Sequence, residues 1–272
     1  MQLETPHDTW TAEAAEANIS EQVDHLRSQG IGESSVCLFA AAATAETVWK
    51  LHALLRIGAV AMPYSPEATE SHLQHLEEAR KQPTNSSPKT RLRLTTTGTT
   101  GTPKIVDINT LQIESSADAS RVRLGVSSED RWLCCLPLHH IAGLSILLRT
   151  AKYGATTVLH PGFDPHRVSR AIDEDNIQVV SLVPTMLQRV MDARDDRPFP
   201  SSLRVILLGG APCPPTLIER CRNIQAPVAL TWGMTETASQ IATRLPGDLR
   251  DAPDVGKPLD GIEVFIADGL LG

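Results

Sequence analysis

The chain has 272 residues, of which 41% are hydrophobic and 21% are charged, so it can bury one large core or two fused smaller ones. Its formal net charge of −7 gives no general attraction to nucleic acid or to an anionic membrane, and both kinds of partner are therefore disfavoured. The five cysteines are odd in number and lack CxxC spacing, which argues against a disulfide framework and a structural zinc site.

The sequence predicts neither a targeting segment nor a membrane span. The first residues, MQLETPHDTW, lack a basic stretch followed by an apolar one, and no apolar run approaches the ~18–20 residues of a spanning helix. We therefore expect a soluble protein in a reducing cytoplasm. The oligomeric state stays open, a homo-oligomer included.

The N-terminal third alternates helical and strand patterns. Residues 12–28 have apolar side chains at helical spacing, and 35–40 reads as a buried strand. Thr44 can cap a second helix, which Gly58 closes before the apolar strand 59–63.

A polar, Pro- and Ser-rich stretch at 81–90 predicts a flexible surface connection, after which the alternation resumes. Further strand candidates lie near 91–96, 131–136, 155–159, 178–183, 203–208 and 227–231, with helical patterns at 164–175 and 184–194. This order predicts an α/β fold of layered, largely parallel sheets flanked by helices. We expect two parts, residues 1–90 and residues 91–272.

The segment LTTTGTTGTPKIV (94–106) predicts a phosphate-binding loop. Glycines let backbone amides converge on one point, threonine hydroxyls add donors, and a lysine adds charge. The candidate ligands are Thr96, Thr97, Gly98, Thr99, Thr100, Gly101 and Lys104. The P-loop class is excluded, because Pro103 stands where GxxxxGK[ST] needs its second glycine. A threonine-rich β-turn is the alternative.

This segment resembles the signature [ST]-[ST]-G-[ST]-T-G-x-P-K-G of adenylate-forming enzymes, with Ile105 in place of the last glycine. That superfamily contains acyl-CoA synthetases, peptide-synthetase adenylation domains and luciferases. Four more segments resemble its motifs in the same order: PLHHIAGLS (137–145), LRVILLGGAPCP (203–214), TWGMTETASQ (231–240) and VGKPLDGIEVFI (255–266). The resemblance implies the large N-terminal domain of an enzyme that uses ATP and Mg²⁺ to activate a carboxylic acid as an acyl-adenylate, with coenzyme A as co-substrate.

The resemblance also implies site residues. Candidates beside the adenine are Gly209, Gly210, Ala211, Trp232, Gly233 and Met234. Trp232 offers a flat face to the base, although a tryptophan after a strand is more often core. Thr235 would face phosphate, and Glu236 supplies the hard oxygen ligand that Mg²⁺ prefers. His140 would lie where the acid meets the α-phosphate, which makes His140, Thr235, Glu236 and Lys104 the catalytic candidates; His139 is expected to pack or to face solvent.

The sequences of residues 140–159 and 233–243 most resemble those of the o-succinylbenzoate-CoA ligases of menaquinone biosynthesis. Their acid is a dianion, so the carboxylate that is not activated needs a cation or hydroxyl groups. The acyl-site candidates are His140, Gly143, Arg149, Ser239, Gln240 and Thr243. A surface position for Arg149, and another aryl or fatty acid as substrate, are the alternatives.

The printed sequence stops at ADGLLG (267–272), whereas the resemblance leads us to expect an aspartate motif, a hinge and a lid with a lysine beyond that point. We expect the C-terminal lid domain to be absent and the N-terminal part to be trimmed. Loss of a cation at the transition state would weaken turnover by this chain alone. The alternative is a non-catalytic or degenerate fragment that binds nucleotide and acyl groups.

Overall fold

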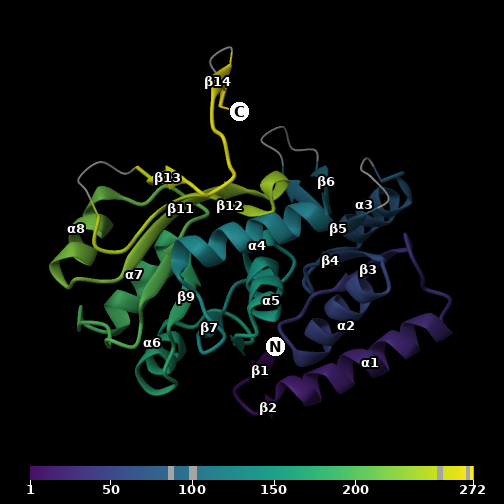
Figure 1. Cartoon of the computed structure of the whole chain (residues 1–272), viewed down its shortest axis with the longest axis horizontal. Coiled ribbons are helices and arrows are strands. Elements are labelled where there is room, and N and C mark those ends of the chain that lie inside the picture. Colours follow the sequence, from purple (N-terminus) through teal and green to yellow (C-terminus); the bar gives the residue numbers. More distant parts are fainter. Residues whose placement is uncertain (85–88, 98–102, 250–253, 268–269, 272) are drawn as a thin grey trace.

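The computed structural model describes residues 1–84, 89–97, 103–249, 254–267 and 270–271. Two sheets with helices packed against them form the body, and a short hairpin of β14 (Ile266–Ala267) and β15 (Leu270–Leu271) projects from it (Figure 1). The predicted α/β class is confirmed. None of the described helices combines the length and apolarity needed to cross a membrane.

The larger sheet carries nine strands in the order β13-β12-β11-β10-β9-β7-β8-β1-β2. Their bounds are β1 Gln2–Glu4, β2 Thr9–Trp10, β7 Arg131–Cys134, β8 Thr156–Leu159, β9 Val179–Leu182, β10 Val205–Leu208, β11 Val228–Met234, β12 Ser239–Arg244 and β13 Lys257–Pro258. Every neighbouring pair from β11 to β1 is parallel, whereas β12, β13 and β2 are antiparallel to their neighbours. The prediction of largely parallel sheets is therefore confirmed.

The smaller sheet has the order β3-β4-β5-β6. Its strands are β3 Val36–Ala40, β4 Val60–Tyr64, β5 Thr90–Thr97 and β6 Pro103–Asn109. The prediction of a buried strand at 35–40 was wrong in one respect: only Phe39 of β3 is fully buried, because β3 lies at the edge of this sheet. Both sheets draw strands from either side of residue 90, and the division into 1–90 and 91–272 stays a prediction.

Helices cover both faces of the larger sheet. The described helices of the whole body are α1 Ala12–Ser28, α2 Ala45–Arg56, α3 Glu70–Lys81, α4 Thr110–Leu124, α5 Ile141–Tyr153, α6 Pro165–Glu174, α7 Pro184–Ala193 and α8 Pro215–Asn223, of which α2 and α3 contact the smaller sheet. Along β7 and just beyond it, Trp132 and Cys134 point into the core shared with α4, α5 and the smaller sheet, and Leu133 and Cys135 point into the core under α6, α7 and α8. This alternation of side chains gives a strand two buried faces.

The predicted borders of α2 are confirmed by their caps. The Thr44 hydroxyl accepts a hydrogen bond from the amide of Thr47, and Gly58 follows the helix at φ +80°. A residue with a Cβ is strained at that φ, so glycine fits the position after the helix end.

Candidate active site

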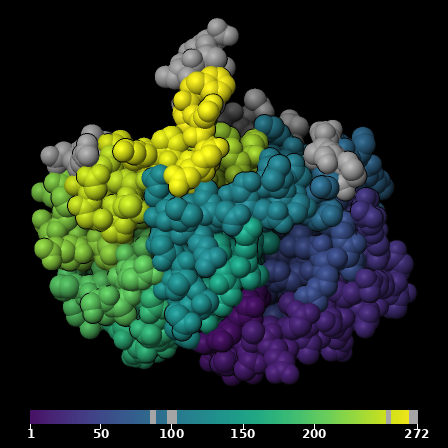
Figure 2. Space-filling view, viewed as in Figure 1, coloured from purple at the N-terminus to yellow at the C-terminus, as the bar shows by residue number. Residues whose placement is uncertain are grey.

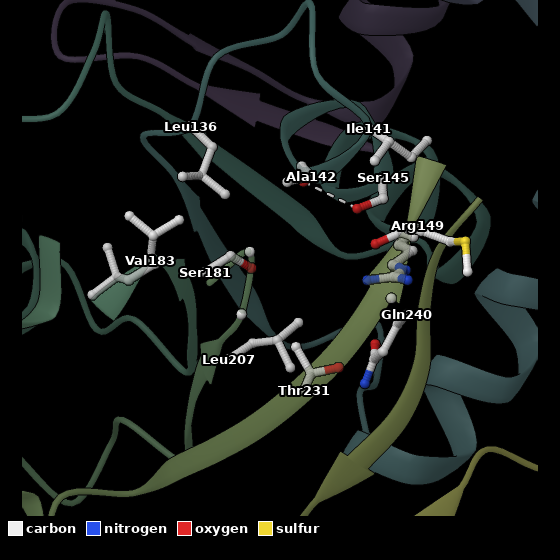
Figure 3. A pocket seen from close by; sticks show the side chains of 16 residues that line it. Leu136, Ile141, Ala142, Ser145, Arg149, Ser181, Val183, Leu207, Thr231 and Gln240 are labelled. Atoms are coloured by element: carbon white, nitrogen blue, oxygen red, sulfur yellow. Dashed lines mark hydrogen bonds between the residues drawn. The ribbon is translucent and has the colours of Figure 1, made fainter. Parts of the chain in front are cut away.

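A cavity of about 130 Å³ lies where α5 meets the carboxyl ends of β9, β10 and β11; we call it the first cavity (Figure 3). It is lined by Leu136, Ile141, Ala142, Ser145, Arg149, Ser181, Leu182, Val183, Leu207, Gly209, Gly210, Thr231, Gly233, Met234, Ser239 and Gln240. Leu136, Val183 and Leu207 form an apolar wall, and Arg149 and Gln240 lie together on the other side. Ligand sites in parallel sheets commonly occupy this position.

Arg149 brings a buried positive charge to the first cavity. Its side chain comes from α5 and the residue is only 2% exposed, so the surface alternative is wrong. The guanidinium donates to Ser116 Oγ at 3.4 Å and lies 6.0 Å from the ring centre of Trp132. Within the described residues it has no carboxylate partner, and burial lowers its pKa. Buried charges in proteins are usually paired, so the chemistry of this site suits an anionic ligand.

Gln240 and Thr243 are joined behind Arg149 in a buried polar network. Gln240 Nε2 donates to Thr243 Oγ1, which lies 3.1 Å from Thr231 Oγ1. Gln240 lines the first cavity, whereas Thr243 is buried and supports it. Of the predicted acyl-site residues, the structure therefore brings Arg149, Ser239 and Gln240 to the cavity wall and places Thr243 behind the wall.

The turn that follows β11 is under backbone strain. Ala238 and Ser239 have φ values of 53° and 99°, in a region that costs a residue with a Cβ roughly 1–3 kcal/mol. Gly233 lies at an irregularity in the pairing of β11 with β12, and a Cβ there would be closer than 3.0 Å to the carbonyl oxygen of Ser239. This glycine permits the close approach of the strands that present Thr235 and Glu236.

Trp232 lies apart from the predicted adenine-binding backbone. It lines a second cavity of about 710 Å³, which is formed by α4, the short helix η1 (Thr235–Thr237), β12 and residues 260–264. The yellow C-terminal segment lies against teal α4 in Figure 2. Gly209 and Gly210 line the first cavity, and Ala211 lines a separate recess. Met234 and Gln240 border the first and second cavities, which makes these two cavities neighbours.

Lys104 and Glu236 meet although they are far apart in the sequence. Lys104 Nζ donates to Glu236 Oε1 at 2.9 Å, and the side chains are 63% and 39% exposed. This bond lowers the pKa of Glu236. Thr96 stands opposite Lys104 in the β5–β6 ladder. The predicted phosphate ligands Gly98, Thr99, Thr100 and Gly101 lie outside the described residues.

Glu236 fits the predicted role of a magnesium ligand. Mg²⁺ at nucleotide sites takes one or two carboxylates and completes its shell with phosphate oxygens and water. Glu236 is a partly exposed carboxylate beside a lysine, and the described residues contain no group of three or more His, Cys, Asp or Glu that could hold a metal. A single carboxylate of this kind therefore suits a Mg²⁺ ion whose other ligands are nucleotide phosphate oxygens and water.

Removing the Lys104–Glu236 pair should leave the fold intact. An exposed pair contributes about 0–1 kcal/mol, so Lys104→Ala and Glu236→Gln should each change the free energy of unfolding in urea by less than ~1 kcal/mol. In Lys104→Ala the pKa of Glu236 should move back toward its usual value of 4.5. The charge-reversed double variant Lys104→Glu, Glu236→Lys is the control. If the free energy of unfolding fell by well over ~2 kcal/mol in the single variants, the pair would have a structural role in the fold.

The two adjacent histidines occupy different environments. His140 is exposed, begins α5 without a side-chain capping bond and does not line the first cavity. His139 is half-buried, its Nδ1 has no hydrogen-bond partner among the described residues, and its ring centre lies 4.2 Å from that of His140. Burial, together with the nearby His140 and His72, lowers the pKa of His139 to about 4. His139 is therefore neutral near pH 7.

The pKa of His139 predicts a loss of stability in acid. The unfolded chain protonates this imidazole near pH 6.5 and the folded chain only near pH 4, so the free energy of unfolding should fall as the pH drops through that window. The buried His52, whose pKa is also lowered to about 4, adds to the slope. Urea unfolding at several pH values gives the free energy of unfolding as a function of pH. This free energy should fall less steeply with decreasing pH in His139→Phe than in the exposed control His166→Phe. Equal slopes would contradict this assignment.

Gly143 has a packing role beside the cavity. A Cβ at this position would lie closer than 3.0 Å to the carbonyl oxygen of Pro137. The glycine lets α5 approach the preceding turn, and the helix can then point Ser145 and Arg149 at the first cavity.

The apolar wall of the first cavity was missed by sequence reasoning. Leu136, Val183 and Leu207 lie in strands that were predicted correctly or within two residues of their ends. The rule that ligands bind at the carboxyl ends of parallel strands could have indicated them.

Comparison with known proteins places the chain in a family. The model of the AMP-binding enzyme family matches residues 79–271, and the chain therefore belongs to that family. It is 42% identical over 195 residues to a 2-succinylbenzoate–CoA ligase of Bacillus licheniformis, a match that covers 71% of this chain and 38% of the relative. The ligase of Bacillus subtilis is 42% identical over 172 residues, or 63% of this chain and 35% of the relative.

Solved structures show the same fold over the described chain. An o-succinylbenzoate coenzyme A synthetase from Bacillus subtilis in complex with ATP and magnesium ion matches with a TM-score of 0.86 and 29% identity, over 99% of this chain and 65% of that one. The same enzyme in complex with its acyl-adenylate intermediate gives a TM-score of 0.84 at 29% identity, over 99% and 63%. The chain thus spans less than two thirds of the length of these relatives.

Proposed function

We propose that this chain provides the ATP- and acid-binding sites of an AMP-forming acid–CoA ligase whose acid is 2-succinylbenzoate. The observation that carries the proposal is the buried guanidinium of Arg149 in the first cavity, which has no anionic partner among the described residues. The benzoate carboxylate of a dianionic acid would supply that partner. The names of the Bacillus relatives support the same acid.

Residues of β5, β6 and η1 would bind the nucleotide. Lys104, Thr96 and Thr235 offer a cation and hydroxyl donors to phosphate oxygens, and Glu236 would hold Mg²⁺, which offsets the phosphate charge. Gly209, Gly210 and Trp232 are proposed for the adenine. An oxygen of the acid attacks the α-phosphorus, pyrophosphate leaves and the acyl-adenylate forms.

In a second step, the thiol of coenzyme A would attack the acyl carbonyl and AMP would leave. His140 is proposed to contact the acid beside the reacting carboxylate. We also propose a cytoplasmic location, since all five cysteines are free thiols, as a reducing compartment would keep them.

Calorimetric titration with a non-hydrolysable acyl-adenylate mimic of 2-succinylbenzoate tests the proposal without requiring turnover. Saturable binding is expected, and it should be lost in the double variant Lys104→Ala, Glu236→Ala, which should remain folded. A second arm uses mimics of a fatty acid and of a simple aryl acid. Tighter binding of one of these would assign a different acid, and no binding of any mimic to the folded chain would reject the proposed function.

A further inference from the structure

One polar face of α4 follows the chain from Glu236 to Thr243. Its members are Gln112, Ser116, Ser120 and Arg123, which donate respectively to Glu236 O at 3.2 Å, Ala238 O at 2.9 Å, Gln240 Oε1 at 3.0 Å and Thr243 O at 3.0 Å. Residues three or four apart lie on one side of a helix, so these four contacts form a continuous row. The row joins the nucleotide end of the site to the wall of the first cavity.

Ser116 is the member of this row that reaches Arg149. A serine hydroxyl has one hydrogen to donate, and Ser116 gives it to the carbonyl oxygen of Ala238. Its lone pairs therefore point elsewhere, and the Arg149 guanidinium donates to one of them at 3.4 Å. Ser116 is 8% exposed and Arg149 is 2% exposed, so little water competes for these bonds.

The backbone around Ala238 fixes the orientation of that hydroxyl. Ala238 has a left-handed φ of 53° and directly follows η1, which carries Glu236. Its carbonyl position is thus set by the turn that presents the predicted magnesium ligand. Because that carbonyl holds the hydroxyl hydrogen, the oxygen of Ser116 is the acceptor that faces Arg149.

We propose that Ser116 is a positioning residue that aims the Arg149 guanidinium into the first cavity and so sets selectivity for acids with a second carboxylate. The inference rests on the proposed function, because it needs Arg149 to receive that carboxylate. Ser116 itself does not line the first cavity. It acts through the arginine.

Two calorimetric probes isolate the contribution of the second carboxylate. One is the acyl-adenylate mimic of 2-succinylbenzoate, and the other is the same molecule with hydrogen in place of the benzoate carboxylate. We define the selectivity as the dissociation constant of the probe without the carboxylate divided by that of the probe with it. In Ser116→Ala this ratio should fall roughly 3- to 10-fold, a range below the ~10-fold or more of a short bond to a charged group because the bond is long. Ser116→Thr, which keeps the hydroxyl, should retain the ratio.

The control is Ser115→Ala, which removes an exposed hydroxyl from the adjacent position of α4. Affinity for the probe without the carboxylate should be equal in wild type and Ser116→Ala. If Ser116→Ala weakened the binding of both probes equally, Ser116 would have only a structural role and the inference would be overturned. An unchanged ratio of dissociation constants would also overturn it. A wild-type chain with no preference for the carboxylate would instead overturn the proposed function, and the inference with it.

Discussion

Methionine in place of Arg149 should make the folded chain more stable while it removes selectivity for the dicarboxylic acid. Arg149 holds a buried charge without a carboxylate partner in the described structure, and a 3.4 Å hydrogen bond to Ser116 and a contact with Trp132 offset only part of its desolvation. Replacing a buried ion pair by apolar groups of similar size is often neutral or stabilises proteins by about 1–4 kcal/mol, and for this unpaired charge we expect about 1–3 kcal/mol. Methionine is unbranched and flexible, so it can fill the same space.

Binding should change in the opposite direction. Loss of one member of a buried charge pair costs about 2–5 kcal/mol, so the affinity for the mimic of 2-succinylbenzoate should fall roughly 10²- to 10³-fold. Urea unfolding and calorimetry would measure the two effects on one preparation. Arg170→Met, at an exposed position of α6, should alter neither. A variant of Arg149 that loses stability and keeps its selectivity would assign the arginine to the core.

Gly233→Ala should damage the fold and the site together. The added Cβ would meet the carbonyl of Ser239, a backbone atom that can move only if β11 and β12 separate. Overpacking commonly costs about 1–3 kcal/mol, and a clash with backbone should reach the upper end of that range or exceed it. Binding of the acyl-adenylate mimic should be lost, because Thr235 and Glu236 follow directly.

Gly32→Ala provides the matched control for this substitution. A Cβ at position 32 meets nothing within 4 Å, and its φ is not in the left-handed region. Its unfolding midpoint in urea should stay close to that of the wild type. A Gly233→Ala chain with wild-type stability and binding would show that the two strands have room to adjust.

The elements that the sequence predicted have a clear apolar pattern. Val168 and Ile172 mark α6, a continuous apolar run marks β10, and an apolar run interrupted by Ser181 marks β9. The helix α8 was not predicted, although its buried side carries Leu217 and Ile218. The sequence did not predict α4, because the buried side of that helix is mostly serine and alanine, with Leu124 as its one large apolar side chain among the buried residues described. Periodicity cannot detect a helix that is held by hydrogen bonds to a neighbouring strand.

Some residues of the site could likewise be predicted from the sequence, and others could not. Resemblance was enough to nominate Lys104 and Glu236, which lie 132 positions apart and meet in the structure. Spacing could not tell which side of α5 carries Arg149, since that depends on the packing of α5 against β7 and α4. Nothing local in the sequence distinguishes Ser116 from the exposed Ser115 beside it.

The pairing of β1 with β8 has a consequence for synthesis of the protein. Gln2 lies beside Thr156, 154 positions along the chain, so β1 can pair only with the two-residue strand β2 until β8 has left the ribosome. At roughly 5–20 residues per second, that interval is on the order of ten seconds. During this time the smaller sheet can already form, because its four strands all lie before residue 110. The nascent chain should therefore expose Leu3 until the larger sheet closes over it, and a chaperone that binds short apolar segments would find it there.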